Sequence, residues 1–301
     1  MKPAAFFVST CAALVFLAGC AGSPTTRQEG SGGPSPHFYH LVVVDHDGVA
    51  VEGASVHYTL YDGKRPVKSS SLTTGPDGLV EDGLETSRNR SRIEYRATKK
   101  GYYETREELL SDYGATRYEK PVNSDYVRLL RTEDYLDPAF VAALPRDALK
   151  DSLFAFIDRM ARRVSRTDPV LMDESVALVR IQNRNYLRFA VDDAIMYNVE
   201  AFTKARLVGR IFSDTALKTA VTAHETLGDS ADMLFGYDVR VLALVRSFCD
   251  PEDRGAVREY RYLISETELK RHLGREITED TLMERSAAFL DGQPIKPAKL
   301  P

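Results

Sequence analysis

The chain has 301 residues, of which 43% are hydrophobic and 28% are charged, and this globular composition excludes a disordered or collagen-like chain. The net charge of −4 argues against a basic nucleic-acid-binding domain, so we expect no nucleic-acid partner. The three cysteines are too few for a disulfide scaffold or a cysteine-built metal site, and we expect neither a metal nor another cofactor.

The N-terminal segment has the pattern of an export signal. Lys2 precedes an uncharged run over residues 4–18, which is shorter than the ~20 apolar residues of a membrane span and typical of a signal-peptide core. The run ends in Leu17-Ala18-Gly19-Cys20, which resembles the lipobox of bacterial lipoproteins at all four positions. The resemblance implies a signal peptide over residues 1–19, cleavage between Gly19 and Cys20, and lipidation of Cys20 as a membrane anchor. The alternative is an anchor helix or an ordinary secretory signal in which Cys20 has no role.

The segment after the lipobox predicts a tether. Residues 21–36 contain no large apolar side chain, so nothing offsets the entropy cost of ordering them. As a coil, this segment would have an r.m.s. reach of roughly 20–24 Å. Residue 21 is Ala, whereas an Asp at this position favours inner-membrane retention in the lipoproteins that the signal resembles. We therefore expect residues 20–36 to hold the protein in the cell envelope, at the outer membrane.

Alternating side chains between residues 38 and 131 predict about seven short strands, for example over residues 56–61 and 92–99. Turn-forming clusters separate these segments, as at residues 62–64 and 75–78. With a length prior of about two domains, we expect a small seven-stranded β-sandwich over residues 37–132.

Three motifs in this region resemble a known family. Val44-Asp45-x-Asp47-Gly48-x-x-Val51-x-Gly53-Ala54-x-Val56 resembles the opening of a carboxypeptidase regulatory-like domain, which has a transthyretin-like β-sandwich fold. Thr74-x-x-Asp77-Gly78 and Ala97-x-Lys99-x-Gly101-Tyr102 resemble its next two signatures, although Gly75 stands where an acidic residue is common. The resemblance implies an accessory module that acts as a spacer, a binding surface or a stabiliser of its neighbour.

The predicted sandwich contains three candidate binding features. Arg88, Arg90 and Arg92 alternate and would contact anionic lipid, lipopolysaccharide or cell-wall carboxylates, or else form a charged edge that prevents aggregation. The cluster at residues 45–48 contains residue types of a calcium loop, but no EF-hand ligand pattern follows, which favours a turn. Ten of the fifteen tyrosines lie between residues 39 and 135 and suit either a recognition face or a sandwich core.

Residues 133–301 mix helix and strand patterns without a regular β-α-β repeat, and they resemble no family that we recognise. Helices are predicted over residues 145–164, 203–224, 265–274 and 278–285, and strands over residues 175–181, 186–195, 239–248, 257–264 and 289–290. This order favours one antiparallel sheet covered by helices on one face. The predicted fold class is therefore α+β multidomain, with the sandwich followed by an antiparallel-sheet α+β domain.

Common catalytic motifs, such as G-x-S-x-G and the Walker A loop, are absent from the sequence. His224-Glu225 begins like a zinc-protease motif, but Gly228 stands at the second ligand position. The two residues form a candidate polar cluster with the nearby acids, or else His224 only complements a helix dipole. Asp192 and Asp193 are adjacent on a predicted strand, so their side chains would point to opposite faces.

Cys249 is the cysteine that remains outside the signal and lipobox. We expect a small buried thiol there, with a reactive thiol or an intermolecular bridge as alternatives.

These observations predict a lipid-anchored, non-catalytic envelope protein that binds or scaffolds another envelope protein or a cell-wall component. The alternative is a periplasmic hydrolase with a site around His224 in the C-terminal region. Solute binding usually requires a larger two-lobed chain. A cleft lined by His224 and two carboxylates would favour the hydrolase, whereas a flat tyrosine-rich or apolar patch above ~600 Å² would favour the binding protein.

Overall fold

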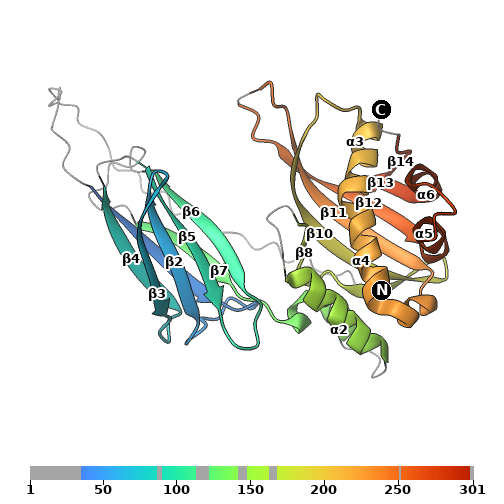
Figure 1. Cartoon of the computed structure of the whole chain (residues 1–301). Helices are drawn as coiled ribbons and strands as arrows, with labels where there is room; N and C mark the ends of the chain where they lie inside the picture. Colours follow the sequence, from blue (N-terminus) through green and yellow to red (C-terminus); the bar gives the residue numbers. More distant parts are fainter. Residues whose placement is uncertain are drawn as a thin grey trace, which may run out of the picture.

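The structure is a computed structural model that describes residues 35–86, 90–112, 122–141, 148–162, 168–250 and 252–298. It is a mixed α+β structure in which the described residues form three sheets (Figure 1). The predicted signal peptide, Gly19, Cys20 and all but the end of the predicted tether lie outside the described residues. Among the described residues, no helix is both long and apolar enough to cross a membrane.

The N-terminal unit, residues 35–131, contains two sheets. A four-stranded sheet has the order β3-β2-β5-β6 and a three-stranded sheet has the order β4-β1-β7. β1 and β7 run parallel, and the other neighbouring pairs of these sheets are antiparallel. The strands are β1 (Ser35–Val44), β2 (Ser55–Asp62), β3 (Arg65–Thr73), β4 (Leu79–Thr86), β5 (Arg90–Thr98), β6 (Thr105–Asp112) and β7 (Val122–Arg128).

Both sheets contribute to one hydrophobic core. In β2, Val56, Tyr58 and Leu60 are buried, and the side chains between them face outward, as the alternation in the sequence predicts. They pack with Ile93 and Ala97 of β5 in a cluster that also includes buried residues of β1, β4 and β7. The outward face of the four-stranded sheet is consequently left with polar side chains.

Three tyrosines of this core bond across the space between the sheets. The Tyr39 hydroxyl contacts Ser91, the Tyr58 hydroxyl donates to Asp82, and the Tyr95 hydroxyl donates to Asp125 Oδ2 at 2.7 Å. Burial, followed by the hydrogen bond with Asp82, raises the pKa of Tyr58 to about 12. These three tyrosines therefore belong to the core, where each buried hydroxyl has the hydrogen-bond partner that burial requires.

The residues that resemble the family signatures form a packed turn. Thr74 is 3% exposed; its hydroxyl accepts from the Ala54 amide at 2.9 Å and donates to the Val51 carbonyl at 2.6 Å. Gly78 has a φ of 70°, and a Cβ atom on it would lie 2.4 Å from the Val43 carbonyl oxygen. Only glycine fits both the positive φ and the close approach of β1 at this position.

The C-terminal unit, residues 132–298, is built on one seven-stranded sheet of order β14-β13-β12-β11-β10-β8, with β9 paired to β10. The prediction of an antiparallel sheet is wrong at one pair, because β10 and β11 run parallel. Helices connect these two strands and return the chain to the same end of the sheet. The strands are β8 (Val170–Leu171), β9 (Ala177–Ile181), β10 (Arg184–Asn198), β11 (Gly236–Arg246), β12 (Ala256–Ser265), β13 (Ala287–Leu290) and β14 (Gln293–Ile295).

Helices cover one face of this sheet and enclose a second hydrophobic core (Figure 1). The Phe156 ring of α2 packs on the Phe189 ring of β10 with centroids 5.0 Å apart. Thr278 caps α6 through its hydroxyl, whereas the Ser265 side chain makes no capping hydrogen bond to α5. The helical segments are η2 (Thr132–Tyr135), α1 (Pro138–Val141), α2 (Ala148–Ala161), α3 (Lys204–Ile211), η3 (Phe212–Ala216), α4 (Leu217–Leu227), η4 (Gly228–Met233), α5 (Glu266–Leu273) and α6 (Glu279–Arg285).

A π-helical turn, η3, interrupts the helix predicted over residues 203–224. Thr215 within it donates to Asp193 Oδ2 at 2.7 Å, and the Tyr197 hydroxyl donates to the same oxygen at 2.8 Å. Asp193 is buried while Asp192 is exposed, so the two side chains face opposite sides of β10 as predicted. The buried carboxylate thus joins the π-helical turn to the strand.

Gly78→Ala should lower the free energy of unfolding by more than Gly48→Ala. Both glycines have positive φ, which costs ~1–2 kcal/mol for another residue. A Cβ atom on Gly48 meets nothing within 4 Å, so Gly48→Ala is a matched control for the backbone cost alone. Urea unfolding of both variants measures the difference, and equal losses would contradict the close approach at Gly78.

Candidate functional site

The two units meet at a joint centred on Tyr103, which lies between β5 and β6. Its ring packs edge-on against Tyr135 with centroids 5.8 Å apart, and its hydroxyl bonds to Thr132 Oγ1 at 2.7 Å. The Tyr103 amide donates to the Leu130 carbonyl at 2.7 Å. Burial raises the pKa of the Tyr103 hydroxyl. A side chain of the N-terminal unit therefore packs against the C-terminal core.

Ion pairs extend the joint on its polar side. His46 Nε2 lies 2.8 Å from Glu174 Oε1, and Arg128 Nη1 lies 3.0 Å from Asp173 Oδ2. His46 belongs to the cluster with the residue types of a calcium loop, but Asp45 Oδ1 there accepts from the amides of Asp47 and Val49. The cluster is thus an Asx-type turn. Its histidine reaches the loop between β8 and β9.

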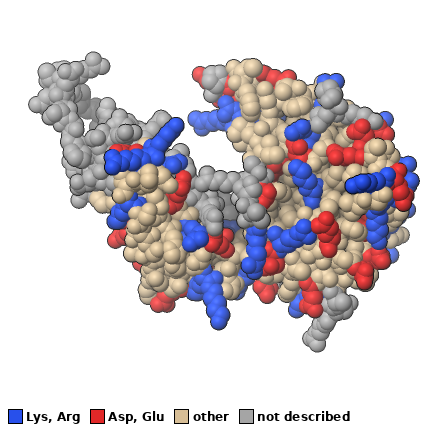
Figure 2. Space-filling view, in the orientation of Figure 1, with Lys and Arg blue, Asp and Glu red and all other residues tan. Residues whose placement is uncertain are grey.

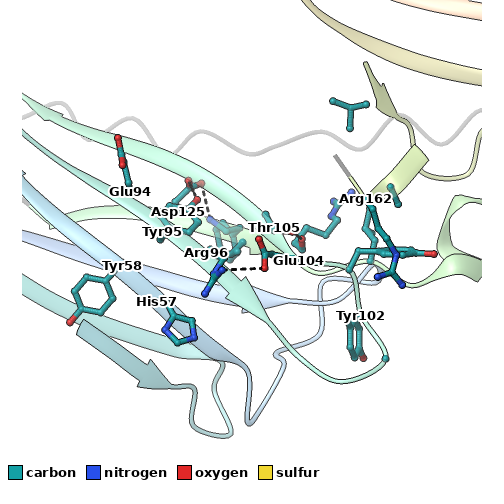
Figure 3. Close-up of a pocket in the computed structure, with 18 of the residues that line it drawn as sticks. His57, Tyr58, Glu94, Tyr95, Arg96, Tyr102, Glu104, Thr105, Asp125 and Arg162 are labelled. Carbon is teal, nitrogen blue, oxygen red and sulfur yellow. Dashed lines mark hydrogen bonds and ion pairs between the residues drawn. The ribbon is translucent and has the colours of Figure 1, made fainter. Parts of the chain in front are cut away.

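Next to the joint lies an open groove with a volume of about 1870 Å³ (Figure 3). Its lining residues include members of β2, β3, β5, the loop between β5 and β6, β7, η2 and α2. Tyr102, Tyr103 and Arg162 line the groove near α2. Tyr126 of β7 also lines the groove and is 73% exposed. Residues of both units line this groove.

The outward face of the four-stranded sheet supplies a row of paired polar side chains to this groove. His57 Nδ1 lies 2.5 Å from the Ser71 hydroxyl, and His57 Nε2 lies 3.3 Å from the Ser55 hydroxyl. Thr59 and Ser69, on the same two strands, bond at 3.0 Å. A serine on each ring nitrogen leaves His57 without the carboxylate that orients a catalytic histidine. The sequence pattern did not reveal this row, because strand pairing brings its members together.

Charged pairs form the rest of the lining. Arg96 Nη1 lies 3.7 Å from Glu104 Oε2, and Arg162, which directly follows α2, pairs with Asp158 of α2 at 2.8 Å. Asp158, chiefly through its hydrogen bonds to the guanidinium, raises the pKa of Arg162. Figure 2 shows the same mixture over the visible face of both units, where Lys and Arg alternate with Asp and Glu. This lining suits a polar ligand with both charges and hydroxyl groups.

Of the three arginines in the predicted anionic-ligand patch, the structure describes the side chain of Arg92. Arg92 lies over the Tyr61 ring, 4.2 Å from its centroid, and its Nη2 is 3.3 Å from Glu94 Oε1. Arg88 lies outside the described residues, and nothing is described of the Arg90 side chain.

His224 and Glu225 bond to different partners. His224 Nδ1 lies 2.8 Å from Glu266 Oε1, whereas Glu225 Oε2 lies 2.9 Å from Arg159 Nη2 on α2. Glu266 is 4% exposed and comes from α5, a segment that sequence spacing did not connect to His224. Neither the groove nor the smaller pocket described below includes His224.

The expectation of a buried Cys249 is wrong, since its thiol is exposed in the loop between β11 and β12. Its neighbour is Glu200, reached across the loop, and the hydrogen bond and charge of Glu200 raise the pKa of the thiol. Within the described part of the chain, no cluster of three or more His, Cys, Asp or Glu residues has the arrangement of a metal site.

No model of a protein family and no curated protein matches the chain. Solved structures similar to part of it include catechol 1,2-dioxygenase from Acinetobacter sp. ADP1 inhibited by bound mercury, with 10% identity over 35% of this chain and 55% of that chain at a TM-score of 0.26. Another is 3-chlorocatechol 1,2-dioxygenase from Rhodococcus opacus 1CP, with 12% identity, 35% and 62% coverage and a TM-score of 0.25. The matches span less than two thirds of those chains, and such low scores support no conclusion about fold or activity.

Tyr103→Ala should loosen the joint, because it removes both the ring contact with Tyr135 and the bond to Thr132. We expect a loss of about 2 kcal/mol in the free energy of unfolding for Tyr103→Ala and ~1 kcal/mol for Tyr103→Phe. Amide hydrogen exchange should accelerate over residues 129–137. The exposed Tyr126 is the control, and Tyr126→Ala should change neither quantity; unchanged exchange in Tyr103→Ala would exclude this joint.

Proposed function

We propose that this protein is a lipid-anchored, non-catalytic component of the cell envelope that binds another envelope protein or a cell-wall component in the groove. Its layout would be a signal peptide over residues 1–19, a lipidated Cys20 with a tether to residue 36, a binding module over residues 37–132 and an α+β domain over residues 133–301. The lipobox and Ala21 support a location at the outer membrane.

The finer fold of the first module is part of this proposal. Its two facing sheets and the structural roles of Thr74 and Gly78 support a transthyretin-like sandwich of the carboxypeptidase regulatory-like type. In such an accessory module the fold presents a surface and the chemistry of that surface selects the partner.

The observation that carries the proposal is the chemistry of the groove lining. Its polar groups bond in pairs, such as His57 with Ser71 and Arg96 with Glu104, and these pairs are spread along an open surface. Catalysis needs a nucleophile, a base and an orienting group that converge on one reacting atom. Polar pairs that are spread along a surface can instead replace their mutual bonds with bonds to an incoming polar chain. An exposed tyrosine adds contact area at low entropy cost.

The binding proposal is tested by photo-crosslinking in the native envelope. A photoreactive residue at position 126, on the groove, should give a specific adduct that is identified by mass spectrometry. The control is position 49, where Val49 is 61% exposed and does not line the groove. No adduct at position 126, or the same adducts from both positions, would refute binding in the groove.

The anchor is tested separately with Cys20→Ser, which should abolish palmitate labelling and release the protein from membranes. One acyl chain binds a membrane only marginally, whereas two or three hold a protein permanently. Cys11→Ser changes a cysteine within the signal and should leave labelling intact, which makes it the matched control. Continued labelling and membrane retention of Cys20→Ser would contradict the lipoprotein assignment.

A further inference from the structure

A second, smaller pocket lies on the face of the seven-stranded sheet that the helices leave open. Its volume is about 230 Å³, and its lining includes Arg188 of β10 and Arg240 of β11. The residues beside them, Phe189 and Val239, point into the helix-covered core, so alternation directs both arginines to the opposite face. The pocket shares no lining residue with the groove.

The nearest buried acid on this face is already saturated. Asp238 is 0% exposed and accepts from Arg188 Nε at 2.7 Å and from Arg261 Nε and Nη2 at 2.6 and 3.0 Å. The carboxylate thus bonds to two guanidinium groups, from strands β10 and β12, and its single negative charge is already shared between them.

Arg240 is left without a counter-ion. It pairs in register with Arg261, and like charges opposite each other destabilise a sheet. Its Nε is buried and has no hydrogen-bond partner, and no ion pair joins its guanidinium to another described residue. A half-buried guanidinium in this state is unfavourable unless a ligand supplies an acceptor.

The loop between β8 and β9 and the start of α1 place carboxylates at the other side of the pocket. Asp137, Asp173 and Glu174 line it. Each bonds through one oxygen, to the Ala139 amide, to Arg128 and to His46 respectively. No partner is described for their second oxygens, which keep acceptor capacity for a cation.

We propose that this pocket binds a small zwitterion, an amino acid or dipeptide with free ends, whose carboxylate pairs with Arg240 and whose ammonium group pairs with the carboxylates. A simple anion would meet three carboxylates, and a simple cation would meet two arginines. The volume is below the ~300–1,000 Å³ of pockets for drug-sized ligands, which restricts the ligand to amino-acid or dipeptide size. This site is separate from the groove, and its test does not depend on the proposed function.

The test is isothermal titration calorimetry of the full-length protein in detergent with L-alanine and L-alanyl-L-alanine. We expect binding of at least one of them, weakened about tenfold or more by N-acetylation and by C-terminal amidation, because each removes one charge-assisted contact. This ligand series needs no protein variant. No binding in the millimolar range, unchanged binding of the capped ligands, or equal binding of inorganic phosphate would overturn the proposal.

Arg240→Gln should also weaken binding about tenfold or more. Arg246→Gln is the matched control, since Arg246 lies on the same strand outside the pocket and should leave affinity unchanged. Arg240→Lys keeps the charge without the guanidinium fork and should retain part of the affinity, which tests the site if Arg240→Gln does not fold. Equal affinity in Arg240→Gln and the unmodified protein would place the ligand elsewhere.

Discussion

The contact on which the rest of the structure depends is the packing of Tyr103 against the C-terminal core. The ring contributes apolar burial, and the bond of its hydroxyl to Thr132 fixes the linker at the point where the chain leaves β7. The ion pair of Arg128 with Asp173 lies on the polar side of the same joint. Residues of both units line the groove, so it does not keep its shape if the units separate, whereas the smaller pocket is lined by the C-terminal unit alone.

The alternation of side chains along the strands gives each unit one apolar face, which forms its core, and one polar face. In β2 and β5, apolar residues, bonded tyrosines and Ser91 point inward, while His57, Thr59 and charged residues such as Arg96 point outward and line the groove. In β10 and β11, Phe189 and Val239 meet the helices while Arg188 and Arg240 face the open side. The buried polar groups are tolerated where they bond, as Asp193 does with Tyr197 and Thr215.

The sequence predicted what depends on local pattern. The alternation of Val56, Tyr58 and Leu60, the helix predicted over residues 278–285 and the opposite faces of Asp192 and Asp193 follow from periodicity and short-range hydrogen bonds. The parallel pairing of β10 with β11, the π-helical turn and the exposure of Cys249 do not, because they depend on where distant segments pack.

The candidate sites were less predictable than the fold for the same reason. His57 with Ser71, His224 with Glu266, and Tyr103 with Tyr135 are contacts between separate segments, and composition carries no signal for them. The spacing of the arginines predicted Arg92 as a ligand-binding residue. In the structure its guanidinium lies over the Tyr61 ring and pairs with Glu94 within the sheet. No sequence pattern marked Arg240 as a binding residue, because it lacks a counter-ion only when Asp238 already bonds to Arg188 and Arg261.

An attached lipid would allow a surface with weak contacts to bind a partner specifically. Contacts with hydroxyls and exposed ion pairs contribute little free energy each, because water competes for the same groups. A tether of roughly 20–24 Å would confine the groove to a thin layer at the membrane, where the effective concentration of an equally confined partner would be high. Specific association would then need complementary geometry more than high affinity, and the open groove of paired polar groups would supply such a surface.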